Sequence, residues 1–211
     1  MMAFGVDEAG KGPVLGSMFA AAVAGDADDL PDGVADSKRL TADRRETLDA
    51  EIRDRMTVGV AEIPVARIDD PATDMNALTV AAQADALSQV AEGGDSGHVD
   101  AGDVNEDRFG RRVAEGVDAE IDVTAEHGAD DEYALVAAAS VVAKVARDDH
   151  VAALAAEYGD VGSGYPSDPT TREFLREYVR EQGGLPDCAR ASWQTSADAL
   201  AAAEQSGLDD F

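Results

Sequence analysis

The chain has 211 residues, of which 44 are Asp or Glu and only 17 are Lys or Arg, so its formal net charge is -27. A hydrophobic content of 45% is enough to build a buried core, which argues against an acidic disordered protein. The absence of a bilayer-length apolar run and of a visible secretion signal, with Cys188 as the single cysteine, predicts a cytoplasmic protein without internal disulfides.

Strand-like and helix-like patterns follow one another along the chain. Residues 3–8 and 14–23 are expected to form two strands joined by a glycine loop, and Thr41 is expected to cap a helix that ends at Met56. The remaining expected elements are a strand at 57–63, a helix at 74–92, a strand at 98–101, a helix near 105–116, a strand at 119–124, a long helix from about 131 and a helix at about 169–182. This order predicts an α/β fold with a mixed central β-sheet flanked by helices.

The expected domain organisation is a single catalytic domain over residues 1–211. Its C-terminal extension would consist of a helical segment at about 186–204 and a tail at 205–211. Within the long helix, one stripe is apolar at 100° per residue: Leu135, Ala139, Val142 and Ala146. Ser140 and Lys144 lie one turn apart on the opposite side, where they either face solvent or present a hydroxyl and an ammonium group to one phosphate.

Acidic residues stand at the ends of apolar segments in three places. Asp7 and Glu8 lead directly into a glycine-rich loop at 10–13, which suits either a tight turn or close approach to a ligand. Asp100 ends a short apolar strand, and Asp130 precedes the long helix. If these four carboxylates converge, they require hard cations between them, and Mg2+ and Mn2+ accept such oxygen ligands. Two such ions stabilise the attacking and leaving oxygens of phosphoryl transfer.

A set of short motifs runs through about residues 3–195. The motifs are Asp7-Glu8-Ala9-Gly10-Lys11-Gly12-Pro13, Asp36-Ser37-Lys38, Val99-Asp100-Ala101, Glu126-His127 with Ala129-Asp130, Ala138-Ala139-Ser140 with Ala143-Lys144, Gly162-Ser163-Gly164-Tyr165-Pro166-Ser167-Asp168, and Ser192-Trp193. In this order they closely resemble the archaeal form of the ribonuclease HII family, or type 2 ribonuclease H. Lys11 stands where the family usually has Arg, which retains backbone contacts but removes a bidentate phosphate ligand.

The resemblance implies a ribonuclease H-like fold. It also implies an endonuclease that hydrolyses the RNA strand of RNA–DNA hybrids and cuts 5′ to ribonucleotides embedded in duplex DNA, leaving a 5′-phosphate and a 3′-hydroxyl. The implied catalytic and metal-binding residues are Asp7, Glu8, Asp100 and Asp130, which would hold two Mg2+ or Mn2+ ions. The implied substrate-binding residues are Gly10, Lys11, Gly12, Lys38, Ser140, Lys144 and Tyr165. The backbone at 10–12 would contact the ribose 2′-hydroxyl, and the tyrosine would stack on the adjacent sugar.

Two alternatives stand beside this function. One is a catalytically silent nucleic-acid-binding or clamp-associated module, and the other is a different metal-dependent nuclease, such as a resolvase-like enzyme, on a related fold. The intact set of acidic residues argues against the silent module. His127 is interpreted as an orienting residue rather than a general base or metal ligand, since a two-metal site can activate water without a protein base.

Charge and the C-terminal residues carry two further signals. The only lysines are Lys11, Lys38 and Lys144, which all lie in the family motifs, and this pattern predicts a halophilic protein whose surface charge is screened by salt. Gln205, Leu208 and Phe211 have the spacing of a peptide that binds a sliding clamp (PCNA), although a frayed amphipathic tail is the alternative. We expect a monomer that binds nucleic acid and no membrane.

Overall fold

The structure is a computed structural model that describes residues 1–34 and 40–209, with side chains described as far as residue 205 within the last helix. The motif Asp36-Ser37-Lys38 and the terminal Phe211, which were singled out from the sequence, lie outside the described residues, as does the side chain of Leu208.

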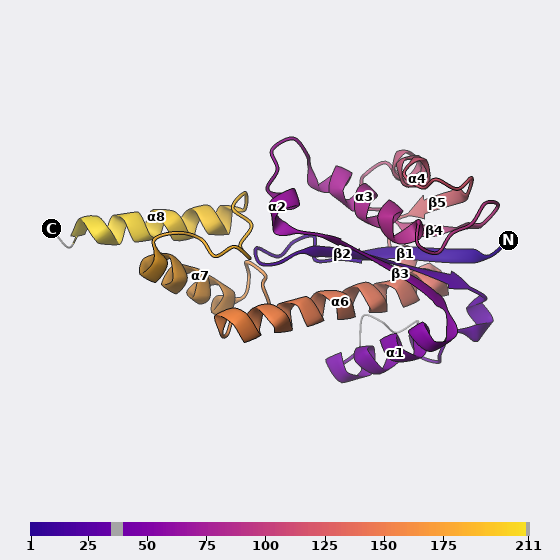
Figure 1. Ribbon diagram of the computed structural model, residues 1–211, viewed down its shortest axis with the longest axis horizontal. Coiled ribbons are helices and arrows are strands. Elements are labelled where there is room, and N and C mark those ends of the chain that lie inside the picture. The colour runs from indigo at the N-terminus through magenta and orange to yellow at the C-terminus, as the bar shows by residue number, and fades with distance from the viewer. Residues whose placement is uncertain (35–39, 210–211) are drawn as a thin grey trace.

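Five strands of the described chain form one mixed sheet in the order β3-β2-β1-β4-β5 (Figure 1). They are β1 (Ala3–Ala9), β2 (Met18–Gly25), β3 (Thr57–Ile63), β4 (Ser96–Asp100) and β5 (Asp122–Glu126). The first three strands are antiparallel neighbours, whereas β4 is parallel to β1 and β5 is parallel to β4. The register pairs Val6 with Val99, so the next residues along each strand, Asp7 and Asp100, lie side by side at the carboxyl ends.

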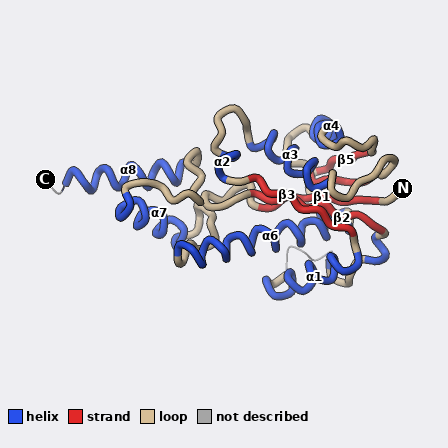
Figure 2. Tube along the Cα trace, viewed as in Figure 1, coloured by secondary structure: helices blue, strands red, loops and turns tan. Residues whose placement is uncertain are grey.

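Helices cover both faces of the sheet. They are α1 (Ala42–Arg55), α2 (Val65–Ile68), α3 (Met75–Leu87), α4 (Glu106–Glu115), α5 (Ala129–Glu132), α6 (Ala134–Tyr158), α7 (Pro169–Gln182) and α8 (Gln194–Asp209), with a short 3-10 helix, η1 (Ala27–Asp29). One face carries α6 with α1 outside it, and the other carries α3 and α4 (Figures 1 and 2). The α7–α8 pair projects beyond the sheet. Among the described helices, none has the length and apolar character needed to cross a membrane.

The buried side chains of the described residues form three apolar clusters. Alternation along β2 directs Ala20 and Ala22 to the cluster beneath α3 and α4, and Ala21 and Val23 to the cluster beneath α6. The third cluster joins the end of α6 to α7 and α8 and includes Cys188, whose thiol is buried. Burial raises the pKa of this thiol to about 11, which suits a structural rather than a reactive cysteine.

Several predicted elements are confirmed by the structure. Thr41 caps α1, and its hydroxyl accepts a hydrogen bond from the Arg44 amide at 3.4 Å. The strand at 57–63 and the helix at 169–182 also have the predicted bounds. Trp193 packs between the first and third clusters and so joins the C-terminal segment to the body.

Other element boundaries were predicted wrongly because distant segments determine them. The second strand begins at Met18 rather than residue 14, since the Val14 amide donates to the Gly164 carbonyl at 2.8 Å and the Gly16 amide donates to Cys188. Helix α3 ends at Leu87 rather than near 92. Beyond it, the side-chain amide of Gln89 bonds to the edge strand β3. The strand predicted at 119–124 lies at 122–126, where it pairs with β4.

The long helix and the C-terminal helix also differ from expectation. Tyr133 is extended and separates α5 from α6, so the predicted helix from about 131 is interrupted. Of the two alternatives for the side of α6 that carries Ser140, exposure to solvent does not hold in the first half of the helix: Ala137 and Ser140 are buried because the helix lies between the sheet and α1. The predicted segment at 186–204 becomes helical only from Gln194, and its helical backbone continues to Asp209.

Candidate active site

Three carboxylates meet at the carboxyl ends of β1 and β4. Asp7, Glu8 and Asp100 offer oxygen atoms that all lie within 4.8 Å of one another. Successive side chains of a strand point to opposite faces of its sheet, so Asp7 is directed toward α6 and Glu8 toward α3. The parallel register of β4 supplies the third carboxylate beside them.

The carboxylate of Asp7 is held from the α6 face. The hydroxyl of Ser140 is buried and bonds to Asp7, and it accepts a hydrogen bond of 2.7 Å from Nζ of Lys144. The sequence predicted that Ser140 and Lys144 would face one phosphate together. In the structure the hydroxyl bonds to the carboxylate, and the lysine lines the neighbouring cleft.

The carboxylate of Glu8 is held from the α3 face by Gln83, a fully buried residue. Its Nε2 atom donates to Glu8 Oε2 at 2.6 Å and to the Asp100 carbonyl at 2.9 Å. Its Oε1 atom has no hydrogen-bond partner in the part of the chain that the structure describes. Sequence reasoning missed Gln83, because one glutamine in an amphipathic helix has no distinguishing pattern.

Asp130 and His127 lie beside the cluster on the turn that enters α5. The Ala129 amide donates to Asp100 Oδ1 at 2.9 Å, so this turn fixes the third carboxylate. Asp130 is buried and its charge acts on Asp100, but among the described residues it lies outside the group of three carboxylates within 4.8 Å. Nδ1 of His127 is 3.1 Å from the Ala101 carbonyl, a contact that suits the orienting role expected for this residue.

Burial makes the ionised cluster unfavourable without a cation. Desolvation, with the charge of Glu8 adding to it, raises the pKa of Asp7 well above its ordinary value. Desolvation also raises the pKa of Glu8 to about 7, although the Lys11 ammonium opposes the shift. The pKa of Asp100 is raised in the same direction, mainly by burial. A hard divalent ion favours oxygen donors and relieves this repulsion, so the donor set fits such an ion.

A cleft of about 390 Å³ opens beside Glu8. Its lining residues are Glu8, Ala9, Gly10, Lys11, Gly12, Arg45, Lys144, Arg147, Asp148 and Tyr165. Cations are scarce in this chain, yet Lys11, Arg45, Lys144 and Arg147 all line this one cleft. A cationic cleft that adjoins a carboxylate cluster with the donor set of a metal site suits a polyanionic substrate.

The two arginines of the cleft were not proposed from the sequence as substrate-binding residues. Asp148 joins them: its carboxylate lies 2.8 Å from Arg45 Nη2 and 3.1 Å from Arg147 Nη1. The guanidinium of Arg147 lies 4.9 Å from the ring centre of Tyr165, which is 39% exposed at the cleft wall. Arg147 had one usable signal, since it lies three residues after Lys144 on the same side of α6.

The loop at 10–12 is held by a buried arginine from the C-terminal segment. Gly10 has a φ of +91°, a region that favours glycine, and a Cβ there would lie 3.0 Å from the Ser17 carbonyl oxygen. Arg190 donates to the carbonyls of Gly10 at 2.6 Å, Lys11 at 3.1 Å and Gly16 at 2.9 Å. Burial lowers its pKa to about 10, so it stays charged at neutral pH. Sequence reasoning missed this residue.

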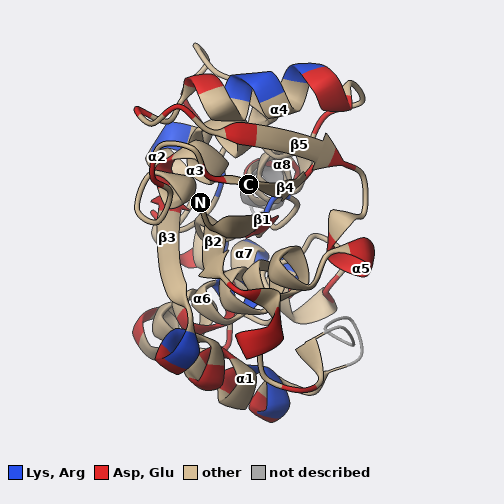
Figure 3. Ribbon diagram, turned by 90° about the vertical axis from the view of Figure 1, so that its right-hand side faces the viewer, with Lys and Arg blue, Asp and Glu red and all other residues tan. Residues whose placement is uncertain are grey.

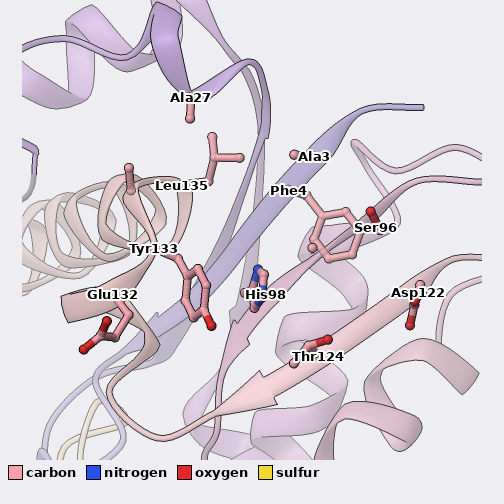
Figure 4. A pocket seen from close by; sticks show the side chains of 12 residues that line it. Ala3, Phe4, Ala27, Ser96, His98, Asp122, Thr124, Glu132, Tyr133 and Leu135 are labelled. Atoms are coloured by element: carbon pink, nitrogen blue, oxygen red, sulfur yellow. The ribbon is translucent and has the colours of Figure 1, made fainter.

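A second cavity, of about 450 Å³, lies near the amino ends of β1 and β4 (Figure 4). His98 and Tyr133 stack within its wall with ring centres 3.6 Å apart, and the tyrosine hydroxyl donates to Glu126 at 2.8 Å. Asp7, Glu8 and Asp100 do not line it. The chemistry of the carboxylates therefore belongs to the smaller, cationic cleft.

Comparisons with known proteins agree with this geometry. The family model for Ribonuclease HII matches residues 4–196. A Ribonuclease HII of Halobacterium salinarum is 75% identical over 100% of both chains. The ribonuclease H2 structure from Pyrococcus horikoshii has a TM-score of 0.90 at 36% identity and covers 97% of this chain and 100% of its own. A PCNA:RNase HII complex from Archaeoglobus fulgidus gives 0.83 at 40% identity, with 92% of this chain and 96% of that chain covered.

The family match spans most of the chain, and the relatives are full-length matches at high identity. The described sheet, with helices on both faces, is a ribonuclease H-like fold. The chain therefore belongs to the ribonuclease HII family and is an endoribonuclease of the ribonuclease H type, acting on RNA–DNA hybrids.

Proposed function

We propose that this endoribonuclease also cuts duplex DNA on the 5′ side of an embedded ribonucleotide, and that its products carry a 5′-phosphate and a 3′-hydroxyl. The observation that carries the proposal is the group of Asp7, Glu8 and Asp100, whose oxygens lie within 4.8 Å beside a cationic cleft. Carboxylates at this spacing favour divalent cations, and the cleft favours phosphates.

Asp7, Glu8 and Asp100 would hold two Mg2+ or Mn2+ ions, with Asp130 on the adjoining turn completing the set. Such ions supply an activated water and stabilise the leaving 3′ oxygen. The chain's own groups orient this chemistry: Ser140 and Gln83 hold two of the carboxylates from opposite faces. The cationic side chains of the cleft bind and align the phosphates of the strand to be cut.

Recognition of the ribonucleotide is assigned to the loop at 10–12 and to Tyr165. The loop backbone would contact the 2′-hydroxyl, the group that distinguishes RNA from DNA. Nζ of Lys11 donates to the Gly102 carbonyl at 2.8 Å and lies 3.9 Å from Glu8, which leaves recognition to the backbone rather than to this side chain. The exposed ring of Tyr165 would stack on the neighbouring sugar, and Lys38 remains a proposed substrate contact.

A sliding clamp is the proposed protein partner. The spacing of Gln205, Leu208 and Phe211 supports this, as does the PCNA complex of the related Archaeoglobus fulgidus protein. Helix α8 projects away from the sheet, so its end is accessible while the body holds a duplex (Figure 1). The proposed state is a monomer with one catalytic domain over residues 1–211.

The proposal is tested by mapping the products from a duplex that contains one ribonucleotide, with Mg2+ and then with Mn2+. Asp7→Asn is expected to lower the rate by more than about 100-fold, because it removes an anionic oxygen from the metal site. Asp54→Asn, at an exposed position on α1, is the matched control and should retain the wild-type rate. A cut on the 3′ side of the ribonucleotide, or a near-normal rate for Asp7→Asn at saturating metal, would contradict the proposal.

A further inference from the structure

The backbone of the loop at 10–12 is tied to the C-terminal segment through its carbonyl groups. The carbonyls of Gly10 and Lys11 accept hydrogen bonds from Arg190 at 2.6 and 3.1 Å. The carbonyl of Gly12 accepts a hydrogen bond from Nε1 of Trp193 at 3.3 Å. All three carbonyls of the loop therefore point toward residues that lie about 180 positions later in the chain.

This arrangement determines where the amide groups of the loop point. A trans peptide is planar, and its C=O and N–H bonds point in opposite directions. The described chain contains no cis peptide bonds, so the N–H groups of Lys11 and Gly12 point away from Arg190. The next residue, Pro13, has no N–H. The same loop lines the cationic cleft.

Arg190 is an unusual residue for a purely structural role. Its side chain is fully buried, and no carboxylate among the described residues lies within ion-pair distance of it. Its guanidinium stacks over Trp193 at 4.9 Å, and its donors are used by backbone carbonyls. The charge of Asp69 acts on this guanidinium, but burial without a direct ion-pair partner is costly, so the three carbonyls that Arg190 binds account for its position.

The segment that carries Arg190 is itself fixed to the body. The carboxylate of Asp69, at the end of α2, accepts hydrogen bonds from the amides of Ala191 at 2.8 Å and Ser192 at 3.0 Å. The Ser192 hydroxyl donates to the same carboxylate. The loop is therefore held in place by a segment that is anchored independently of any ligand.

We propose that Arg190, assisted by Trp193, is a positioning residue for ribonucleotide recognition. It holds the loop carbonyls away from the cleft, so that the amides of Lys11 and Gly12 form a fixed pair of donors for an oxygen of the ribonucleotide. This inference rests on the proposed function, since it concerns how the same loop recognises its substrate. Arg190 itself does not line the cleft.

The chain offers a direct test because Lys11 is one of only three lysines. Protein labelled with 15N-lysine gives three backbone amide resonances. Lys11→Arg assigns the one from the loop, and Lys144→Arg assigns the one from α6, which is the internal reference. Arg190→Met is expected to shift or broaden the Lys11 resonance and leave that of Lys144 in place. Arg53→Met, which removes an exposed arginine from α1, is the matched control and should move neither.

Binding supplies the second readout. Fluorescence anisotropy without divalent ions compares a duplex containing one ribonucleotide with an all-DNA duplex of the same sequence. Arg190→Met is expected to lower the preference for the ribonucleotide by about tenfold, because the donor pair is no longer held in place. Arg190→Lys should recover part of this preference, and Trp193→Phe, which retains a ring but loses the donor to Gly12, should cause a smaller loss.

The possible outcomes separate the two proposals. An unchanged Lys11 resonance in Arg190→Met, or a displaced resonance with the preference intact, would overturn the positioning role. If circular dichroism shows that Arg190→Met is unfolded, the positioning role is tested with Trp193→Phe instead. The same two measurements apply, namely the Lys11 amide resonance and the preference for the duplex that contains a ribonucleotide. A wild-type protein that shows no preference for the ribonucleotide would contradict the proposed function, whereas the Lys11 resonance would still decide whether Arg190 positions the loop.

Discussion

Gln83 and Ser140 determine how the acidic residues of the site are presented. Each is buried, and each bonds to a carboxylate from its own side of the sheet. The positions of Asp7, Glu8 and Asp100 were predictable because each ends an apolar strand within a recognisable motif. The residues that support them, and Arg190 behind the loop, were not predictable, because their roles arise only from contacts between distant segments.

Removal of the Gln83 amide is expected to weaken the metal site. In Gln83→Leu, Glu8 loses a donor at 2.6 Å and the end of β4 loses its link to α3. We expect the affinity for Mn2+ to fall by about 10- to 100-fold, the range typical of residues that orient metal ligands. Calorimetric titration at fixed KCl measures this. Gln89→Leu, which removes a side-chain amide bonded to β3, is the control, and equal affinities in both variants would contradict the role of Gln83.

The pKa of Glu8 makes stability depend on pH. Its folded-state pKa is about 7, whereas its ordinary value is 4.5, so the folded protein binds this proton more tightly than the unfolded chain. The resulting stabilisation is fully present below about pH 4.5 and is lost as the pH rises through about 7. In EDTA, Tm should therefore fall more between about pH 5 and 7 for wild type than for Glu8→Gln. Added Mn2+ should reduce the difference, and parallel melting curves in both proteins would reject this assignment.

At the scale of single elements, local sequence signals predicted some helices correctly, whereas contacts between distant segments determine the bounds of other elements. Helices α1 and α7 were placed correctly because Thr41 caps the first and Asp168 followed by Pro169 begins the second. The region after α3 is held by the bond from Gln89 to β3, and the bounds of β5 are set by its pairing with β4. The local sequence pattern contains no information on either contact. The alanine-rich first half of α6 suits its position between two layers, where small side chains permit burial on both sides.

Helix α8 leads to a prediction about binding of the sliding clamp. It packs on α7 through residues such as Ala199, whereas Glu204 and Gln205 are exposed. Deletion of residues 205–211 should abolish binding to PCNA and leave cleavage of a short duplex nearly unchanged, because the carboxylate cluster and the cleft lie elsewhere. Calorimetric titration of the clamp with full-length and truncated protein is the measurement.

A double variant, Leu208→Ala with Phe211→Ala, should reproduce the effect of the deletion, since these apolar side chains would supply most of the contact. Glu204→Gln, just before the tail, is the matched control and should retain affinity. Equal affinities for full-length and truncated protein would show that the tail makes no clamp contact. Loss of folding in the truncated protein would show that it is structural.

At the scale of the whole molecule, the excess of negative charge is the dominant property. Helices α1 and α4 carry acidic and basic side chains side by side, and α5 is acidic (Figure 3). The basic residues are too few to balance the acidic ones, so the chain keeps a formal net charge of -27. The similarity to the protein of the halophilic archaeon Halobacterium salinarum fits a protein adapted to concentrated salt.

Stability should therefore depend strongly on salt. The Debye length falls from about 10 Å at 0.1 M to about 3 Å at 1 M, so the repulsion between surface carboxylates is screened. We expect Tm to rise by roughly 10 °C or more between about 0.1 and 2 M KCl. Sucrose at equal osmolality is the control, since it strengthens burial without screening charge. A Tm that is flat or highest in dilute buffer would reject a halophilic adaptation.

The buried thiol of Cys188 has a practical consequence for measuring contacts made by the C-terminal helix. Because burial raises its pKa to about 11, almost none of it is thiolate at neutral pH, and the thiolate is the form that reacts with maleimides. The natural chain thus provides a background that thiol dyes do not label. A cysteine introduced at exposed Glu204 would carry the one reactive sulfur, and a fluorophore there would report directly on what approaches the end of α8.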